Sequence, residues 1–255
     1  ASVNQAGATA VLTQVFMVYN VLSYKLKFSY RILFLVLYFI SIFAAFVTFS
    51  KAAMLGSLIV FILFIRSIFS RNIYHLKISR KIRTPLILLL LLSSVFVNNY
   101  FISKLDIEQL RRLDLFGEFL SGRIDEETTT KRSEIALMVL NKVKDENYMG
   151  TGLDSYHRIE GFGLGTHNQY LIFLGEIGIF GLILFLLYLG KLGLDLYKIK
   201  VQNIRFLGLG IFCVLVITCA VAHTILFTKT YVVMFALLGV LSFYQFTLLN
   251  KKSNE

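Results

Sequence analysis

Long apolar stretches separated by short charged connections dominate the sequence. A transmembrane helix needs about 20 mostly apolar residues, and six stretches approach or meet this length. They are residues 30–49, 52–69, 84–102, 167–190, 206–227 and 231–249. A shorter seventh stretch, residues 8–23, is weaker because Thr13, Gln14 and Asn20 interrupt it. The pattern predicts an all-α, polytopic transmembrane helix bundle of about seven spans.

The composition agrees with a membrane protein. Of the 255 residues, 56% are hydrophobic and 16% are charged, and the mean hydropathy is +0.71. Soluble domains carry about 25% charged residues, so these values exclude an ordinary soluble domain as well as a disordered chain. The two cysteines, Cys213 and Cys219, lie in one apolar stretch, where neither a disulfide framework nor a zinc site is supported.

Lys and Arg are unevenly distributed over the connections between the stretches. The connections alternate between two sides, and one side carries fifteen Lys and Arg against two acidic residues. Because cytoplasmic loops are rich in Lys and Arg, that side is predicted to be cytoplasmic. The formal net charge of +11 therefore reflects topology and gives no support to nucleic-acid binding.

The chain divides into four parts on this basis. Residues 1–102 hold the first four transmembrane helices, 103–165 form one large extracytoplasmic loop, 166–249 hold three more helices, and 250–255 form a cytoplasmic tail. Two stretches of the loop have helical spacing. They are Ile107, Leu110, Leu113 and Phe116, and Ile135, Met138, Val139 and Lys142. The loop ends in five glycines within residues 150–165, which allow a backbone to approach another group closely.

The densest group of chemically useful residues follows these glycines. Gly161-Phe-Gly163-Leu-Gly-Thr leads into His167-Asn168-Gln-Tyr170-Leu171 at the predicted outer start of a span. A histidine at this boundary titrates near neutral pH and can take a proton from a hydroxyl group. The alternative is that His167 only caps the helix.

Glu176 lies in the same predicted span. In a straight helix it would be on the face opposite His167 and about 13 Å deeper in the membrane, so a direct acid–base partnership is not expected. A buried carboxylate in a membrane normally has a partner on another helix, which favours a structural role. Gly175, Gly178 and Gly181 would let a neighbouring helix approach closely.

Three cations on the extracytoplasmic side are candidates for binding an anion. Lys51 follows Ser50 in a very short turn between two spans, and Arg123 and Arg132 lie in the large loop. Arginine makes planar, bidentate contacts to phosphate. The ordinary alternatives are an interfacial lysine that extends to water and solvated loop arginines.

Taken together, these motifs resemble the O-antigen ligase and O-antigen polymerase superfamily of bacterial envelope enzymes. The matching motifs are Ser50-Lys51-Ala52, Arg132 ahead of Ile135-Ala-Leu, Gly161-Phe-Gly163, His167-Asn168-Gln-Tyr170-Leu171 and Glu176-Ile-Gly178-Ile-Phe-Gly181. Ligases usually carry Arg where Lys51 stands and an aromatic residue where Ala136 stands. Arg132 is preferred over Arg123 because a predicted helix follows it. Family members have more spans, and this chain begins with Ala and without a signal peptide, so it is expected to be a C-terminal portion.

The resemblance implies a metal-independent glycosyltransferase without a cofactor, with its active face on the periplasmic side of the bacterial inner membrane. The donor would be a glycan on undecaprenyl diphosphate in the lipid bilayer, and the acceptor would be lipid A-core or a growing glycan. Lys51 and Arg132 (or Arg123) would hold the diphosphate and stabilise it as a leaving group. His167, catalytic together with Arg132, would orient or deprotonate the acceptor hydroxyl. Supporting residues would be Gly163, Asn168, Tyr170 and Glu176. Ligase and polymerase share this donor chemistry, and both remain open.

A transporter or flippase for a lipid-linked or anionic substrate is the alternative from another class. It would need the same outward cations but not His167 as a base. Transporters usually place polar groups near the bilayer midplane, where the sequence offers only Glu176 and a few hydroxyl groups.

Overall fold

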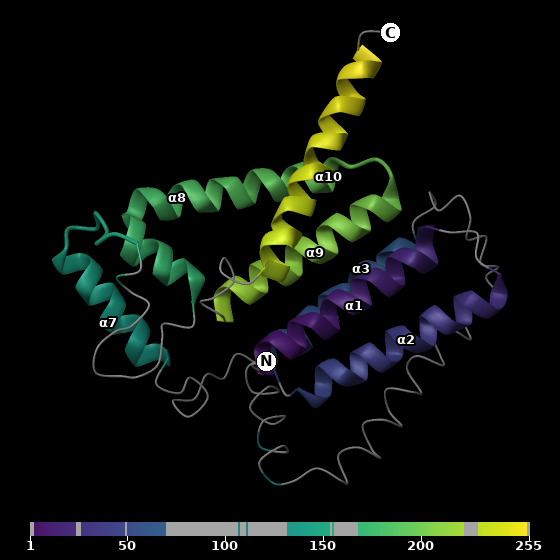
Figure 1. Ribbon diagram of the computed structural model, residues 1–255, viewed down its shortest axis with the longest axis horizontal. Coiled ribbons are helices and arrows are strands. Elements are labelled where there is room, and N and C mark those ends of the chain that lie inside the picture. Colours follow the sequence, from purple (N-terminus) through teal and green to yellow (C-terminus); the bar gives the residue numbers. More distant parts are fainter. Residues whose placement is uncertain are drawn as a thin grey trace.

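The computed structural model describes residues 3–23, 27–48, 50–69, 132–153, 168–221 and 229–253, together with positions 107, 111 and 155. These residues form seven helices and no strand (Figure 1). The helices are α1 (Val3–Ser23), α2 (Phe28–Val47), α3 (Lys51–Phe69), α7 (Arg132–Asp145), α8 (Gln169–Lys198), α9 (Gln202–Val221) and α10 (Lys229–Ser253). The all-α prediction is confirmed for this part of the chain. The predicted span at 84–102 and most of the periodic stretch at 107–116 lie outside it.

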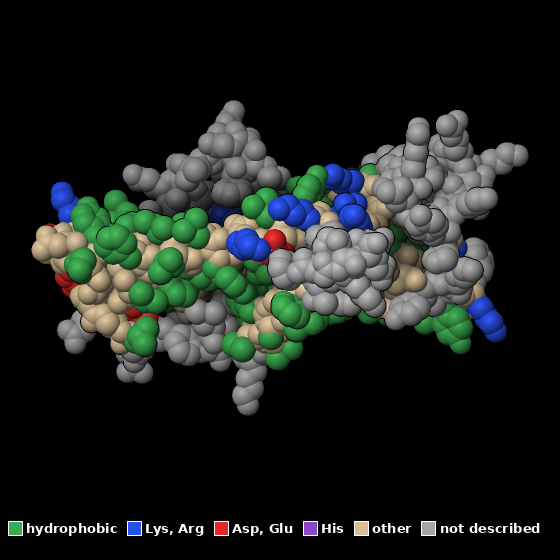
Figure 2. Space-filling model, turned by 90° about the horizontal axis from the view of Figure 1, so that it is seen from above, with side chains coloured by type: hydrophobic (Ala, Val, Ile, Leu, Met, Phe, Trp, Pro, Cys, Tyr) green, Lys and Arg blue, Asp and Glu red, His purple; other side chains and the backbone are tan. Residues whose placement is uncertain are grey.

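Four of the described helices contain segments long and apolar enough to cross a membrane. These segments are Gln5–Ser23, Ser29–Val47, Gln169–Lys198 and Gln202–Val221, and a shorter apolar segment covers Tyr231–Phe243. Large apolar side chains are exposed along α2, α8 and α10, for example Ile40, Leu187 and Val240. Figure 2 shows hydrophobic side chains over much of the described surface. Helices that are apolar on their outward faces as well as their inward faces are typical of a membrane protein.

α1 lies at the centre of the bundle, where it packs against α2, α3 and α9. Its Val11 and Val15 are buried. Gln14, one of the polar residues that weaken this stretch in the sequence, is fully buried and bonded across the bundle. Its Nε2 donates to Ser57 Oγ at 2.8 Å and to Ser41 O at 3.3 Å. Polar side chains are tolerated inside membrane bundles when they bond to a neighbouring helix, so the weak seventh stretch forms a full helix.

The Lys and Arg residues of the described bundle helices lie at its two ends. The ends of α1 and α3 lie beside the start of α9, because Asn203 Nδ2 donates to Ser23 Oγ at 2.9 Å and Gln202 Nε2 donates to Ser67 O at 3.2 Å. We call this the basic end, and it carries Lys27, Arg31, Arg66, Lys191, Lys198, Lys200 and Arg205. The opposite end, where α3 begins, is called the Lys51 end. This separation matches the alternation of charge along the sequence.

α8 is broken at Gly178, which has φ 78° and ψ −175°, a conformation essentially limited to glycine. The first segment of α8 (169–177) folds back over the second segment (179–198), because Phe173 stacks on Phe185 with ring centroids 4.3 Å apart. In a straight helix these two residues would be separated by about 18 Å along the axis. The second segment alone is about 30 Å long, which equals the thickness of the bilayer core.

The break corrects two expectations from the sequence. Glu176 does not lie along a straight helix that runs inward from its start. It lies two residues before the break at Gly178 and is 9% exposed. Figure 1 shows the change of direction within α8. At Gly178 and Gly181 the close approach is also not made by a neighbouring helix, as was predicted for them together with Gly175. The atoms nearest to a Cβ at Gly178 belong to the backbone of Tyr148 and Met149, and those nearest to one at Gly181 belong to Ile177 of the same helix.

α7 packs on α8 through a small core of its own. Ile135, Val139 and Val143 are buried together with Leu174. The predicted helix is confirmed, but its buried face differs from the predicted one, since Met138 is 38% exposed and Lys142 is also exposed. The i, i+4, i+8 spacing of the buried residues marks a narrow stripe, which is what a helix buries when one short partner covers it.

Candidate active site

The turn between α2 and α3 fixes the position of Lys51. Thr48 Oγ1 donates to Ala45 O at 2.6 Å and accepts from the Ser50 amide at 3.4 Å. Ser50 is buried, and its Oγ accepts from the Ala53 amide at 3.4 Å, so Ser50 caps α3 and Lys51 is the first helical residue. A cation at a helix N-terminus is opposed by the helix dipole, whereas an anion bound there would interact favourably with both.

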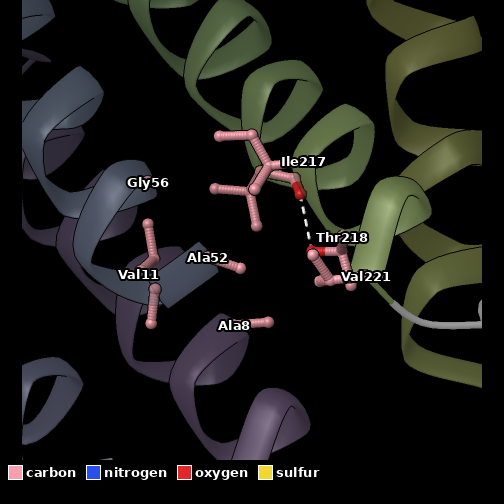
Figure 3. A pocket seen from close by; sticks show the side chains of 9 residues that line it. Ala8, Val11, Ala52, Gly56, Ile217, Thr218 and Val221 are labelled. Carbon is pink, nitrogen blue, oxygen red and sulfur yellow. Dashed lines mark hydrogen bonds between the residues drawn. The ribbon is translucent and has the colours of Figure 1, made fainter. Parts of the chain in front are cut away.

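A small apolar hollow lies beside this turn, between α1, α3 and α9 (Figure 3). Its lining consists of Ala8, Val11, Ala52, Ala53, Gly56, Val214, Ile217, Thr218 and Val221. The one hydroxyl in this lining, Thr218 Oγ1, donates to Val214 O within its own helix at 2.6 Å. The hollow therefore offers methyl groups and no unused donor to a ligand.

Asn168 fixes the start of α8. Its backbone is extended, with φ −147° and ψ 112°, and its Oδ1 accepts from the amides of Tyr170 at 2.9 Å and Leu171 at 3.2 Å. These bonds satisfy two of the amide groups that every helix N-terminus leaves without partners. Because Asn168 occupies the cap position, the alternative in which His167 serves as the helix cap is wrong.

Tyr170 attaches the start of α8 to α9. Its hydroxyl donates to Val216 O at 3.1 Å, and its ring lies against Phe185 with centroids 6.0 Å apart. The neighbouring residues of α9, Ile217 and Thr218, line the hollow beside Lys51. The start of α3 and the Asn168–Tyr170 motif are far apart in the sequence. The fold brings both to the same turn of α9, where Tyr170 bonds to Val216 and Ala52 faces Ile217 and Thr218 across the hollow.

Arg132 is the first residue of α7. α7 lies beside the first segment of α8 (Figure 1), and the residues that follow α7 bond to Gly175 and Glu176 at the far end of that segment. α7 and the first segment of α8 therefore run in the same direction, and their starts lie at the same end of the pair. The prediction that a helix follows Arg132 is confirmed.

Three other predicted site residues, Arg123, Gly163 and His167, lie outside the described residues, and the proposals for them stay predictions. His167 directly precedes the cap residue Asn168. Among the described residues, no three His, Cys, Asp or Glu side chains lie close enough to hold a metal ion. Metal independence also stays a prediction.

Two features at this end of the molecule were not expected from the sequence. Gln169 is only 2% exposed, and its Oε1 has no hydrogen-bond partner. The sequence offers one indication of a role for Gln169, which is its position between the motif residues Asn168 and Tyr170. The backbone of Tyr148–Gly152 docks onto the break in α8. Gly150 and Gly178 each indicate in the sequence that another group approaches the backbone closely. The sequence does not indicate that these two glycines lie against each other.

Comparison with known sequences identifies one family. A family model described as O-Antigen ligase matches residues 36–186, a range that includes Lys51, Arg132, Asn168, Tyr170 and Glu176. No curated protein and no solved structure matches the chain.

Proposed function

Because the chain belongs to the O-antigen ligase family, we propose that it is a glycosyltransferase that takes a glycan from undecaprenyl diphosphate at the periplasmic face of the bacterial inner membrane. One observation carries this proposal. The start of α3, directly after Lys51, and the capped start of α8 both lie beside the same turn of α9, at the Lys51 end of the bundle. The acceptor is lipid A-core for a ligase and the growing glycan for a polymerase.

The diphosphate of the donor binds between Lys51 and Arg132, with Arg123 as the alternative to Arg132. Lys51 and Arg132 are the first residues of α3 and α7, so the partial positive charge of each helix N-terminus adds to that of the side chain. The lipid of the donor stays in the bilayer while its phosphates remain at the surface. An anion at this place would remove the unfavourable interaction between Lys51 and the dipole of α3.

The reaction moves one glycan and one proton. The acceptor hydroxyl oxygen forms a bond to the anomeric carbon of the donor glycan as the bond from that carbon to the diphosphate oxygen breaks. The diphosphate leaves on its lipid, and the cations stabilise the charge that develops on it. The proton of the acceptor hydroxyl passes to the neutral imidazole of His167. The donor bond supplies the free energy, so no nucleotide is needed.

The distribution of cations supports the orientation. Seven described Lys and Arg lie at the basic end, which would face the cytoplasm by the positive-inside rule. The Lys51 end would then face the periplasm, together with α7 and the start of α8.

The position of the break in α8 favours an enzyme over a transporter. Transporters place broken helices and their binding sites near the bilayer midplane. The second segment of α8 is long enough to cross the bilayer core by itself, so the break lies at one end of a span.

Cysteine labelling tests the orientation. In a background without Cys213 and Cys219, a membrane-impermeant maleimide should label Glu126→Cys in intact cells, because the loop lies outside the cytoplasm. The matched variant Lys200→Cys, which is exposed at the basic end, should react only after the inner membrane is permeabilised. The reverse pattern would place the Lys51 end in the cytoplasm and remove the proposed reaction.

A further inference from the structure

Three backbone hydrogen bonds join the segment after α7 to the break in α8. The amides of Thr151 and Gly152 donate to Gly175 O and Glu176 O, and the amide of Ile179 donates to Tyr148 O, each at 3.0 Å. In an unbroken helix the Ile179 amide would bond to Gly175 O. The segment after α7 therefore replaces bonds that the break removes, and we call this arrangement, residues 148–152 with 175–179, the junction.

Glycine is required on both sides of the junction. Gly150 has φ 80° and Gly178 has φ 78°, a region that other residues rarely adopt. A Cβ at Gly150 would lie 2.5 Å from Gly178 N, and one at Gly178 would lie 2.6 Å from the Met149 carbonyl. Ordinary contact begins at 3.4 Å, so either side chain would force the two backbones apart by about 0.8 to 0.9 Å.

The connection between α7 and the junction is very short. Only Glu146 and Asn147 separate the end of α7 from Tyr148. Asn147 and Tyr148 have φ values of 54° and 60°, and the Tyr148 amide donates to Val143 O at 2.9 Å. A positive φ is unfavourable for a bulky residue such as Tyr and persists only where the surroundings impose it. The end of α7 is thus held against the break by its own backbone.

Two contacts consequently make α7 and the first segment of α8 one rigid unit. The apolar core of Ile135, Val139 and Leu174 joins the helices along their length, and the junction joins them at the end beside Gly178. Arg132 begins one helix of this unit, and Asn168, which follows His167, begins the other. A displacement at the junction would move these two starts relative to each other.

We propose that Gly150 and Gly178 are positioning residues, which set the placement of Arg132 relative to the His167–Asn168 start of α8. This inference rests on the proposed transfer reaction, in which Arg132 acts on the leaving diphosphate and His167 on the acceptor. Neither glycine touches the substrates. Each acts by keeping the two backbones in contact.

Steady-state kinetics of the full chain in membranes test this inference. Gly178→Ala should lower kcat for glycan transfer by about 10²-fold, because a displacement near 1 Å of catalytic groups has that effect. KM for the lipid-linked donor should rise by a smaller factor than kcat falls, because Lys51, the other proposed diphosphate ligand, lies on α3 and is not moved. Gly150→Ala should behave in the same way.

The chain offers two matched controls. Gly190→Ala lies in the same helix with nothing within 4 Å of the added Cβ and should keep the kcat of the unaltered protein. Gly152→Ala imposes an unfavourable φ of 95° on the same loop, also with nothing within 4 Å, and should lose far less activity than Gly150→Ala. Equal kcat values for Gly178→Ala and Gly190→Ala would overturn the inference. An unaltered protein without any transfer activity would instead overturn the proposed function.

If the Gly178→Ala protein does not accumulate, hydrogen exchange in the unaltered protein tests whether the junction is held together. In the unaltered protein the amide hydrogens of Gly152 and Ile179 should exchange on the order of 10² times more slowly than that of the exposed Leu153. Exchange of all three at the same fast rate would show that the junction is not held, and would overturn the inference without reference to the reaction.

Discussion

Replacing His167 by alanine should reduce the rate of glycan transfer by about 10²–10⁴-fold, the range expected when a general base is removed. Expression and donor binding should stay near normal, because Lys51 and Arg132, the cations proposed to bind the diphosphate, begin α3 and α7. In the unaltered protein the rate should also fall as the pH is lowered, since only the neutral imidazole accepts the hydroxyl proton. Initial rates of transfer from a labelled lipid-linked glycan, measured over a pH series, check both expectations.

Asn168 provides the control for this experiment. Because Asn168 caps α8, Asn168→Ala should lower the stability of the folded protein by about 1 kcal/mol. His167→Asn should leave thermal stability unchanged, yet it should be as inactive as His167→Ala, since an amide cannot take up the proton. An active His167→Asn variant with an unaltered pH profile would remove His167 from the chemistry.

Replacing Arg132 by alanine should lower transfer on the order of 10²–10³-fold, the loss expected when one group that stabilises developing charge is removed. Arg132→Lys should keep far more activity because it retains the charge, although it loses the bidentate geometry. The comparison requires kcat/KM for the lipid-linked donor in all three proteins. Lys51→Ala should show a loss in the same direction, since Lys51 is held at the start of α3.

Arg123→Ala is the control for the choice between the two loop arginines. Arg123→Ala should retain nearly full activity if Arg132 holds the diphosphate. If Arg123 holds it instead, Arg123→Ala should lose activity and Arg132→Ala should retain it. Normal transfer by both alanine variants would mean that the proposed diphosphate site is misplaced.

The helices were largely predictable from the sequence because each follows from a local pattern. Apolar length predicts α2 and α3 to within two residues at each end, and it predicts α9 over the described residues 206–221. The stretch that becomes α1 looked weak because Gln14 was counted as an interruption. Its acceptors, Ser57 Oγ and Ser41 O, lie on other helices, and no local pattern reveals such partners.

The break in α8 was not predictable in the same way. A window of hydropathy cannot distinguish one long helix from two segments that fold back on each other. Gly178 appeared in the sequence as a helix-packing glycine, whereas its φ and ψ and its contact with Met149 make it the point of the break. The hydrogen bond from the Ile179 amide to Tyr148 O joins residues that are far apart in the sequence, so no local pattern predicts it.

The candidate site shows the same division. Lys51, Asn168 and Tyr170 were identified from residue type and motif order, and Arg132 was preferred because a helix follows it. The arrangement of the α3 start and the Tyr170 motif around one turn of α9 depends on the Tyr170–Val216 bond and on the hollow that Ala52 and Ile217 both line. Both contacts belong to tertiary structure, so the sequence predicted the residues and not their arrangement.

Product analysis in reconstituted vesicles tests whether the protein transfers a glycan at the Lys51 end of the bundle. The full chain is inserted into vesicles that contain a labelled glycan on undecaprenyl diphosphate and a lipid A-core or glycan acceptor. We expect label bound covalently to the acceptor together with released undecaprenyl diphosphate, and neither product with His167→Ala. Labelled glycan that crosses the bilayer still attached to its lipid, without any covalent product, would contradict the proposed transfer reaction.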